Sequence, residues 1–185
     1  MLENNLSKAA AVISDGGIIA YPTEAVWGLG CDPDNGHAVK KILDLKQRPE
    51  SKGVILIAAQ IDQLSEYLGG LNQAAMDKLM ASWPGPVTWL VPHNGRAPSW
   101  IRGQYDSVAL RVTDHKQTAE LCKAYGGPIV STSANINQMP SLKTMSEVEA
   151  CFGSGIDYYL AGELGGRENP SEIRQLNNDK VWRQG

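Results

Sequence analysis

The sequence brings small polar side chains together where one apolar run ends. Residues 128–135 read PIVSTSAN, so a β-branched run passes directly into Ser131, Thr132 and Ser133, with Asn135 two residues further on. In open α/β sheets, ligands bind beyond the carboxyl ends of the strands. Hydroxyls and an amide there supply hydrogen-bonding groups without bulk. We therefore expect a binding site, although the same residues would also suit a turn.

Cations elsewhere in the chain have the chemistry to hold an anionic substrate. Lys46 and Arg48 follow a predicted helix, and arginine grips a phosphate as a fork where lysine acts as a point charge. The alternative for this pair is a favourable interaction with the helix C-terminus. Arg111 lies in an apolar predicted strand, so it needs a carboxylate partner inside the protein or an anionic ligand. The sequence leaves both open.

Several familiar catalytic patterns are missing. The sequence has no Gly-x-Ser-x-Gly motif. Gly28-x-Gly30 is followed by Pro33, where a dinucleotide fingerprint needs glycine. The cysteines and histidines are scattered, without the spacing of metal ligands. The remaining cations and hydroxyls favour phosphoryl or nucleotidyl transfer, because positioning and electrostatics carry most of that catalysis.

Alternating helices and strands must position these residues, so the predicted class is α/β. Apolar periodicity predicts helices over 4–16, 37–47, 62–68, 71–83, 115–125 and 146–151. Apolar runs predict strands over 17–21, 53–59, 87–91, 107–112, 158–161, 180–183 and the 128–135 stretch. Residues 22–32 and 92–104 are predicted to be loops, and residues 162–174 form a Gly-rich polar segment. We expect one domain over residues 1–185, since no linker or repeat interrupts it.

Composition narrows the functional classes further. The net charge is -3 and the pI is about 5.6, so no overall positive field attracts nucleic acid or anionic membranes. The N-terminus does not resemble a signal peptide, and no apolar run approaches membrane-spanning length. Three widely spaced cysteines do not suggest a disulfide framework. A cytoplasmic protein without a membrane partner is expected.

Six motifs, in order along the chain, resemble those of the YrdC-type threonylcarbamoyl-adenylate synthases. They are PTE at 22–24, LKQRP at 45–49, WPGPVT at 83–88, VALRV at 108–112, STSAN at 131–135 and NPSEIR at 169–174. Each motif is short, but six in family order over nearly the whole chain form a specific signal. The resemblance is to the short, single-domain bacterial form. It implies a twisted, open mixed sheet with flanking helices and a concave basic cavity.

The resemblance implies a nucleotidyltransferase that condenses L-threonine, bicarbonate or CO2, and ATP into threonylcarbamoyl-AMP and pyrophosphate. Other proteins of the pathway would then transfer the threonylcarbamoyl group to adenosine 37 of tRNA. Mg2+ is expected on the phosphates of ATP, and no metal site made of protein ligands is expected. Whether tRNA binds this chain directly is left open.

The same resemblance implies roles for particular residues. A catalytic role falls on Lys46, Arg48, Ser133 and Asn135. Threonine would be held by Thr23, Arg111 and Ser171, with Arg111 as a bidentate partner of its carboxylate. The nucleotide would be bound by Lys46, Arg48, Thr132, Ser133 and Arg174.

The chain departs from the family pattern at one point. Longer relatives carry an arginine just after the Ser-x-Asn loop, whereas residues 137–140 here read NQMP, with Lys143 as the nearest cation. The residue that contacts the distal phosphates is therefore open.

Two other functions compete with the synthase interpretation. One is a non-catalytic RNA-binding factor, for example in ribosome maturation, that uses the same cavity; the acidic composition argues against it. The other is the carbamoyl-adenylate chemistry of hydrogenase-maturation carbamoyltransferases, which use carbamoyl phosphate. Those proteins carry further domains that this chain is too short to include.

Overall fold

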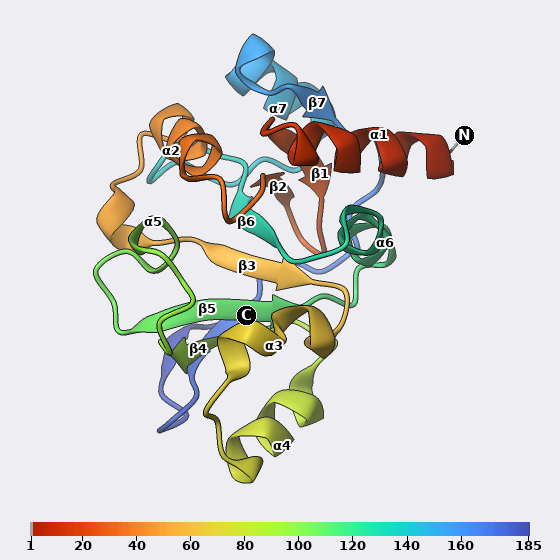
Figure 1. Ribbon diagram of the computed structural model, residues 1–185. Helices are drawn as coiled ribbons and strands as arrows, with labels where there is room; N and C mark the ends of the chain where they lie inside the picture. Colours follow the sequence, from red (N-terminus) through yellow and green to blue (C-terminus); the bar gives the residue numbers. More distant parts are fainter. Residues whose placement is uncertain (1) are drawn as a thin grey trace.

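The computed structural model describes residues 2–185, which form a twisted nine-stranded sheet surrounded by helices (Figure 1). The strands are β1 (Ile19–Pro22), β2 (Trp27–Gly30), β3 (Ile55–Ala58), β4 (Val87–Pro92), β5 (Ser107–Val112), β6 (Ile129–Ser133), β7 (Tyr158–Tyr159), β8 (Glu172–Gln175) and β9 (Val181–Arg183). Their order across the sheet is β7-β1-β2-β6-β3-β5-β4-β8-β9. Neighbouring strands are parallel in some pairs and antiparallel in others. The predicted α/β class and mixed sheet are confirmed.

The register of the central strands sets which side chains share a face. Ile57 of β3 lies beside Arg111 of the parallel strand β5 and opposite Ile129 of the antiparallel strand β6. Two residues earlier in β3, Ile55 lies opposite Ser131. Because alternate side chains of a strand point to the same face, Arg111 and Ser131 lie on one face, with Ile57 and Ile129.

Helices cover both faces of the sheet. They are α1 (Leu2–Ser14), α2 (Gly36–Leu45), α3 (Ser65–Leu68), α4 (Gln73–Ser82), α5 (Ser99–Arg102), α6 (Lys116–Tyr125) and α7 (Met145–Phe152). Short 3-10 turns occupy Glu50–Lys52, Ile61–Leu64 and Gly153–Gly155. Within residues 2–185, no helix is both long and apolar enough to cross a membrane.

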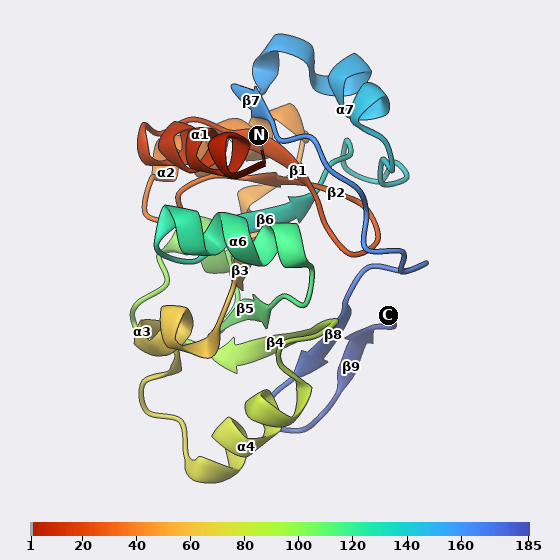
Figure 2. The ribbon, with the colours of Figure 1, turned by 90° about the vertical axis from the view of Figure 1, so that its right-hand side faces the viewer.

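One of the two apolar cores covers part of one face of the sheet and leaves the rest of that face open. Helices α1 and α6 pack against each other (Figure 2), and Ile13 and Leu121 form a core with Tyr21, Ile57 and Ile129. This core covers only one end of the face that carries Arg111. At the other end of this face, residues of β5, β4 and β8 line the cavity described below.

Two strands begin in segments for which no strand was predicted. Strand β2 falls within residues 22–32 and pairs with β1, and glycine is required there because a Cβ at Gly30 would lie 2.7 Å from the Val130 carbonyl oxygen. Strand β8 begins at the end of residues 162–174, extends to Gln175 and pairs with β4. With only four residues, β8 is too short for an alternation of apolar and polar side chains to be recognised in the sequence. The predicted loop 92–104 likewise contains α5.

Candidate active site

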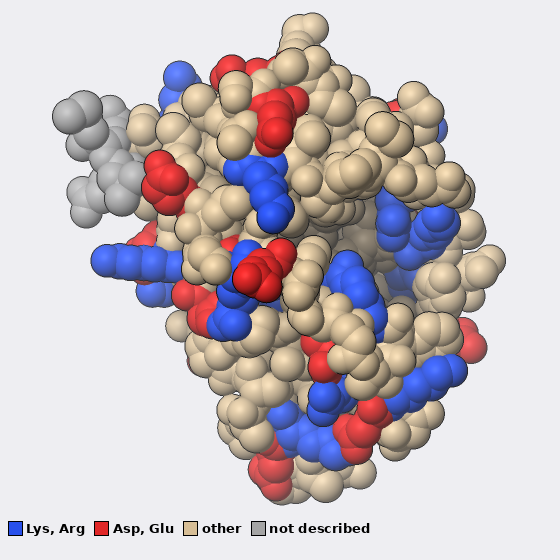
Figure 3. Space-filling view, turned by 180° about the vertical axis from the view of Figure 1, so that it is seen from behind, with Lys and Arg blue, Asp and Glu red and all other residues tan. Residues whose placement is uncertain are grey.

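A cavity of about 320 Å³ opens on the face of the sheet that carries Arg111. Among the residues described, its lining contains one carboxylate and five cations: Glu24, Arg48, Lys52, Arg102, Arg111 and Arg183. Figure 3 shows Lys and Arg side chains gathered around this hollow. The chain is therefore locally basic despite its net charge of -3, as the predicted concave basic cavity requires.

The three residues predicted to hold threonine all line the cavity. Thr23 lies in the turn between β1 and β2, and its hydroxyl donates to the Val26 carbonyl oxygen at 2.6 Å. Ser171 precedes β8, and its hydroxyl lies 2.8 Å from that of the buried Thr88. Arg111 comes from β5, and all three residues line the cavity. Because its own proton is committed to Val26, the Thr23 hydroxyl is left to accept a hydrogen bond from a ligand.

Arg111 has an internal partner and also faces the cavity. Its Nη1 lies 3.1 Å from Oε2 of Glu24, and both side chains are buried. Glu24 also accepts a hydrogen bond from the Thr113 hydroxyl at 2.5 Å. Nε of Arg111 has no hydrogen-bond partner among the described residues. That Nε is itself buried, so an anionic ligand in the cavity would be met by the other N–H groups of the guanidinium, of which Nη1 is paired with Glu24.

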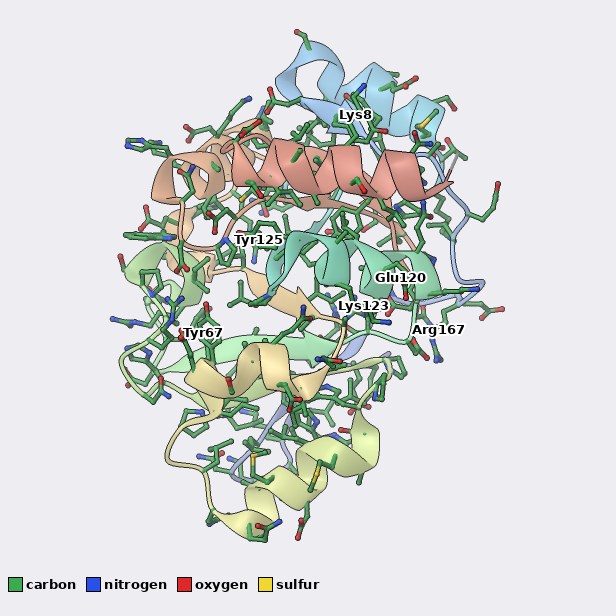
Figure 4. All side chains as sticks on the ribbon, turned by 45° about the vertical axis from the view of Figure 1, so that its right-hand side comes forward. Lys8, Tyr67, Glu120, Lys123, Tyr125 and Arg167 are labelled. Carbon is green, nitrogen blue, oxygen red and sulfur yellow. The ribbon has the colours of Figure 1, made fainter. Side chains whose placement is uncertain are left out.

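The loop that delivers Ser171 is tied to the rest of the site. In the segment from β7 to β8, Gly165 N donates to the Thr23 carbonyl oxygen at 3.0 Å, and Arg167 N donates to that of Glu24 at 3.0 Å. Arg167 also pairs with Asp114 at 2.7 Å, beside the N-terminal end of α6 (Figure 4). These contacts hold the loop against the turn that carries Thr23 and Glu24.

Arg48 and Ser133 reach the cavity from neighbouring segments. Arg48 follows α2 and donates from Nη2 to the Gly53 carbonyl oxygen at 3.0 Å. Ser133 ends β6, and its hydroxyl donates to Oδ1 of Asn135 at 2.6 Å. Both side chains line the cavity. Burial lowers the pKa of Arg48, which an anionic ligand would offset.

Lys46 and Asn135 lie behind this wall and do not line the cavity. Lys46 is 2% exposed, and its Nζ donates to the Ser133 carbonyl oxygen and, at 2.8 and 3.2 Å, to the carbonyl and side-chain oxygens of Asn135. Burial, with a smaller effect of Arg48, lowers the pKa of Lys46 to about 7. The structure therefore splits the four residues predicted to be catalytic into two that face the cavity and two that do not.

The remaining two predicted nucleotide-binding residues also separate. Thr132 lines the cavity, beside Ser133. Arg174 does not: it stacks on the ring of the buried Trp89, 5.7 Å from the centroid, and its Nε donates to Glu172 at 2.6 Å. Its neighbours Ile173 and Gln175 are the β8 residues that face the cavity. Strand alternation thus turns Arg174 to the opposite side.

Sequence reasoning missed Arg183, although it lies in a strand that was predicted. Its Nε and Nη2 donate to the Ser171 carbonyl oxygen at 3.0 and 2.6 Å, and it lines the cavity. Burial, then the positive charges of Arg111 and Arg48, lower the pKa of Arg183, so Arg183 is repelled by these two arginines. The sequence did show a cation in a short strand near the C-terminus. It gave no indication that this strand would lie beside Ser171.

Three further residues at the cavity were also not predicted. Lys52 lines it and donates to Oδ1 of Asn137 at 3.3 Å, in the segment just after the Ser-x-Asn turn. Lys143, the nearest cation in sequence, does not line it. Two exposed aromatic residues, Tyr105 and Trp182, also line the cavity.

Comparison with known proteins places this arrangement in a family. The model of the Sua5/YciO/YrdC domain, described as telomere recombination, matches residues 11–185. A threonylcarbamoyl-AMP synthase of Cellvibrio japonicus is 52% identical over 182 residues, which cover 98% of this chain and 96% of that protein. The synthase of Pseudomonas aeruginosa strain PAO1 is 53% identical over 175 residues, covering 95% and 94%.

Solved structures share the fold. Sua5 of P. abyssi, crystallised with L-threonine, has a TM-score of 0.89 and 30% identity, covering 97% of this chain. This chain corresponds to only 53% of that longer protein. YciO of E. coli has a TM-score of 0.87 at 22% identity, covering 99% of this chain and 90% of its own, and shows the fold alone. The match over most of the sequence and the close relatives establish that the chain belongs to the Sua5/YciO/YrdC family.

Proposed function

We propose that this chain is a threonylcarbamoyl-AMP synthase, which converts L-threonine, bicarbonate or CO2, and ATP into threonylcarbamoyl-AMP and pyrophosphate. The observation that carries the proposal is one cavity that is lined by Arg48, Arg111 and Arg183 together with Thr23 and Ser171. Such a site holds anions and positions them, which is what nucleotidyl transfer requires. Relatives about half identical over nearly their whole length bear the same activity in their names.

Threonine fits the end of the cavity formed by Thr23, Arg111 and Ser171. The carboxylate would take the donors of Arg111 that Glu24 leaves free. The hydroxyl of Thr23 would accept from the amine. In the reaction, the amine adds to CO2, and an oxygen of the resulting carbamate attacks the α-phosphorus of ATP, whose bond to pyrophosphate breaks. The amine must lose a proton to form the carbamate, so the amine is held by an acceptor rather than by a cation.

Further cations that line the cavity suit the triphosphate. Arg48, Lys52 and Arg183 line the cavity and would neutralise charge on the phosphates as pyrophosphate departs. Mg2+ would enter with ATP as part of the substrate. Among the described residues, no cluster of three His, Cys, Asp or Glu side chains could hold a metal ion. Lys52 is our candidate for the contact to the distal phosphates, because Lys143 lies away from the cavity.

Isotope incorporation tests the proposal directly. Purified protein is incubated with MgATP, L-threonine and 13C-bicarbonate, and the product is analysed by mass spectrometry. We expect threonylcarbamoyl-AMP that carries the label in its carbamoyl carbon, for transfer by partner proteins to adenosine 37 of tRNA. A labelled product from carbamoyl phosphate but not from bicarbonate would instead support the related carbamoyl-adenylate chemistry. No adenylate, with salt-sensitive RNA binding, would support the RNA-binding alternative.

A further inference from the structure

We propose that Lys46 and Asn135 are positioning residues, which fix the Ser133–Asn135 turn as a wall of the cavity and do not contact the nucleotide. The inference rests on the proposed function, because it concerns a wall of the same site. The proposal gives the two residues of each motif, Lys-x-Arg and Ser-x-Asn, different roles. Arg48 and Ser133 face the substrate, and Lys46 and Asn135 hold Ser133 in place.

The ammonium of Lys46 has no free hydrogen-bond donor. It carries three N–H groups, and three oxygens accept from it: the carbonyl oxygens of Ser133 and Asn135 and Oδ1 of Asn135. The side chain is 2% exposed and does not line the cavity. A phosphate oxygen could gain a hydrogen bond from Lys46 only if one of these bonds broke.

Asn135 is equally occupied. Its Oδ1 accepts from both Lys46 and the Ser133 hydroxyl, and its Nδ2 donates to the carbonyl oxygens of Ile136 and Met139 at 2.9 and 2.7 Å. The backbone adds a further link, since Asn137 N donates to the Lys46 carbonyl oxygen at 2.7 Å. The end of α2 and the segment after β6 are thus joined through one hydrogen-bond network, and among Lys46, Ser133 and Asn135 it is Ser133 that lines the cavity.

Backbone geometry explains why two cations two residues apart point to different places. Lys46 caps α2 in a helical conformation, and Gln47 has a φ of 51°, a left-handed value unusual for a residue other than glycine. Helix α2 ends here, and the left-handed residue Gln47 separates the buried Lys46 from Arg48, which lines the cavity. No carboxylate lies within ion-pair distance of Lys46 in the described part of the chain. The acceptors of its three hydrogen bonds are all carbonyl or amide oxygens.

The test compares Lys46→Met with Arg48→Met in pyrophosphate release from MgATP, L-threonine and bicarbonate. Arg48→Met removes charge-assisted hydrogen bonds to substrate, so its KM for ATP should rise roughly 10- to 100-fold. Lys46→Met should lower kcat by roughly tenfold or more and change the KM for ATP by less than about threefold, because a misplaced wall impairs the transition state more than binding. Lys46→Arg should not restore kcat, because a planar guanidinium does not fit three acceptors arranged for an ammonium.

A double-variant cycle supplies the matched control. If Lys46 and Asn135 act through the same turn, Lys46→Met combined with Asn135→Ala should lower kcat no more than about twofold beyond the worse single variant. Arg48→Met combined with Asn135→Ala should instead show both defects. If Lys46→Met fails to fold in a thermal melt, Asn135→Ala carries the same KM and kcat test with the lysine in place.

Equilibrium titration with MgATP separates this proposal from the proposed function, because it requires no turnover. Even if the wild-type protein released no pyrophosphate, Lys46→Met should bind MgATP within about threefold of wild type, while Arg48→Met binds it roughly 10- to 100-fold more weakly. A loss of affinity in Lys46→Met as large as in Arg48→Met would overturn the proposal. So would full activity in Lys46→Arg.

Discussion

Replacing Glu24 by Gln should destabilise the protein strongly, because Arg111 would lose its buried partner. The pair is 3.1 Å apart, and its side chains are 8% and 5% exposed. Removing one member of such a pair typically costs ~3–5 kcal/mol in the free energy of unfolding. We expect the upper part of that range. Glu24 is the one carboxylate lining the cavity in residues 2–185, and without it the repulsion among Arg48, Arg111 and Arg183 is uncompensated.

Urea denaturation, followed by tryptophan fluorescence, measures this cost, and a surface pair serves as the control. Lys40 and Asp44 are 3.0 Å apart but 67% and 66% exposed, so Asp44→Asn should cost less than ~1 kcal/mol. Added pyrophosphate should stabilise Glu24→Gln more than wild type, since the anion replaces the missing negative charge. A Glu24→Gln cost as small as that of Asp44→Asn, or no extra stabilisation by pyrophosphate, would refute the reasoning.

Three further predictions follow from the cavity and its wall. Arg183→Gln should raise the KM for ATP roughly 10- to 100-fold, and an unchanged KM would place the triphosphate elsewhere. Trp182→Ala should raise it roughly tenfold if the 59%-exposed indole stacks on the adenine; an equal change with Trp182→Phe would argue against stacking. Because the pKa of Lys46 is about 7 when folded and roughly 10.4 when unfolded, the unfolded chain binds the extra proton between these values. The free energy of unfolding should therefore rise with pH from 7 to about 10, and Lys46→Met should lack this rise.

The main strands were predictable because their physical signal is local. Residues 53–59 and 107–112 are continuous apolar runs, and they form β3 and β5 in the middle of the sheet. Strand β2 was not predictable, because its glycines have no side chain with which to show an alternating pattern. They are there for the close approach of Tyr21 and Val130 from neighbouring strands. That reason exists only in the folded protein.

The candidate site was predictable in composition and only partly in geometry. Arg111 stood out as a charge in an apolar strand, and the structure shows both an internal partner and a place at the cavity. The inward direction of Lys46 depends on the left-handed backbone of Gln47, for which the sequence offers no glycine as a signal. The place of Arg183 beside Ser171 depends on the pairing of β8 with β9, which has a register shift near Ile173. Such long-range pairing is not encoded in spacing.

Pyrophosphate release is the measurement that tests the central claim most directly. Purified protein is given MgATP alone, with L-threonine, with bicarbonate, and with both, in CO2-depleted buffer. We predict release only when threonine and bicarbonate are both present. We also predict that Arg111→Met loses this release, because the contact to the threonine carboxylate is removed. Release from ATP without threonine, or no release from folded protein under any of the four conditions, would contradict the assignment of this cavity to threonylcarbamoyl-AMP synthesis.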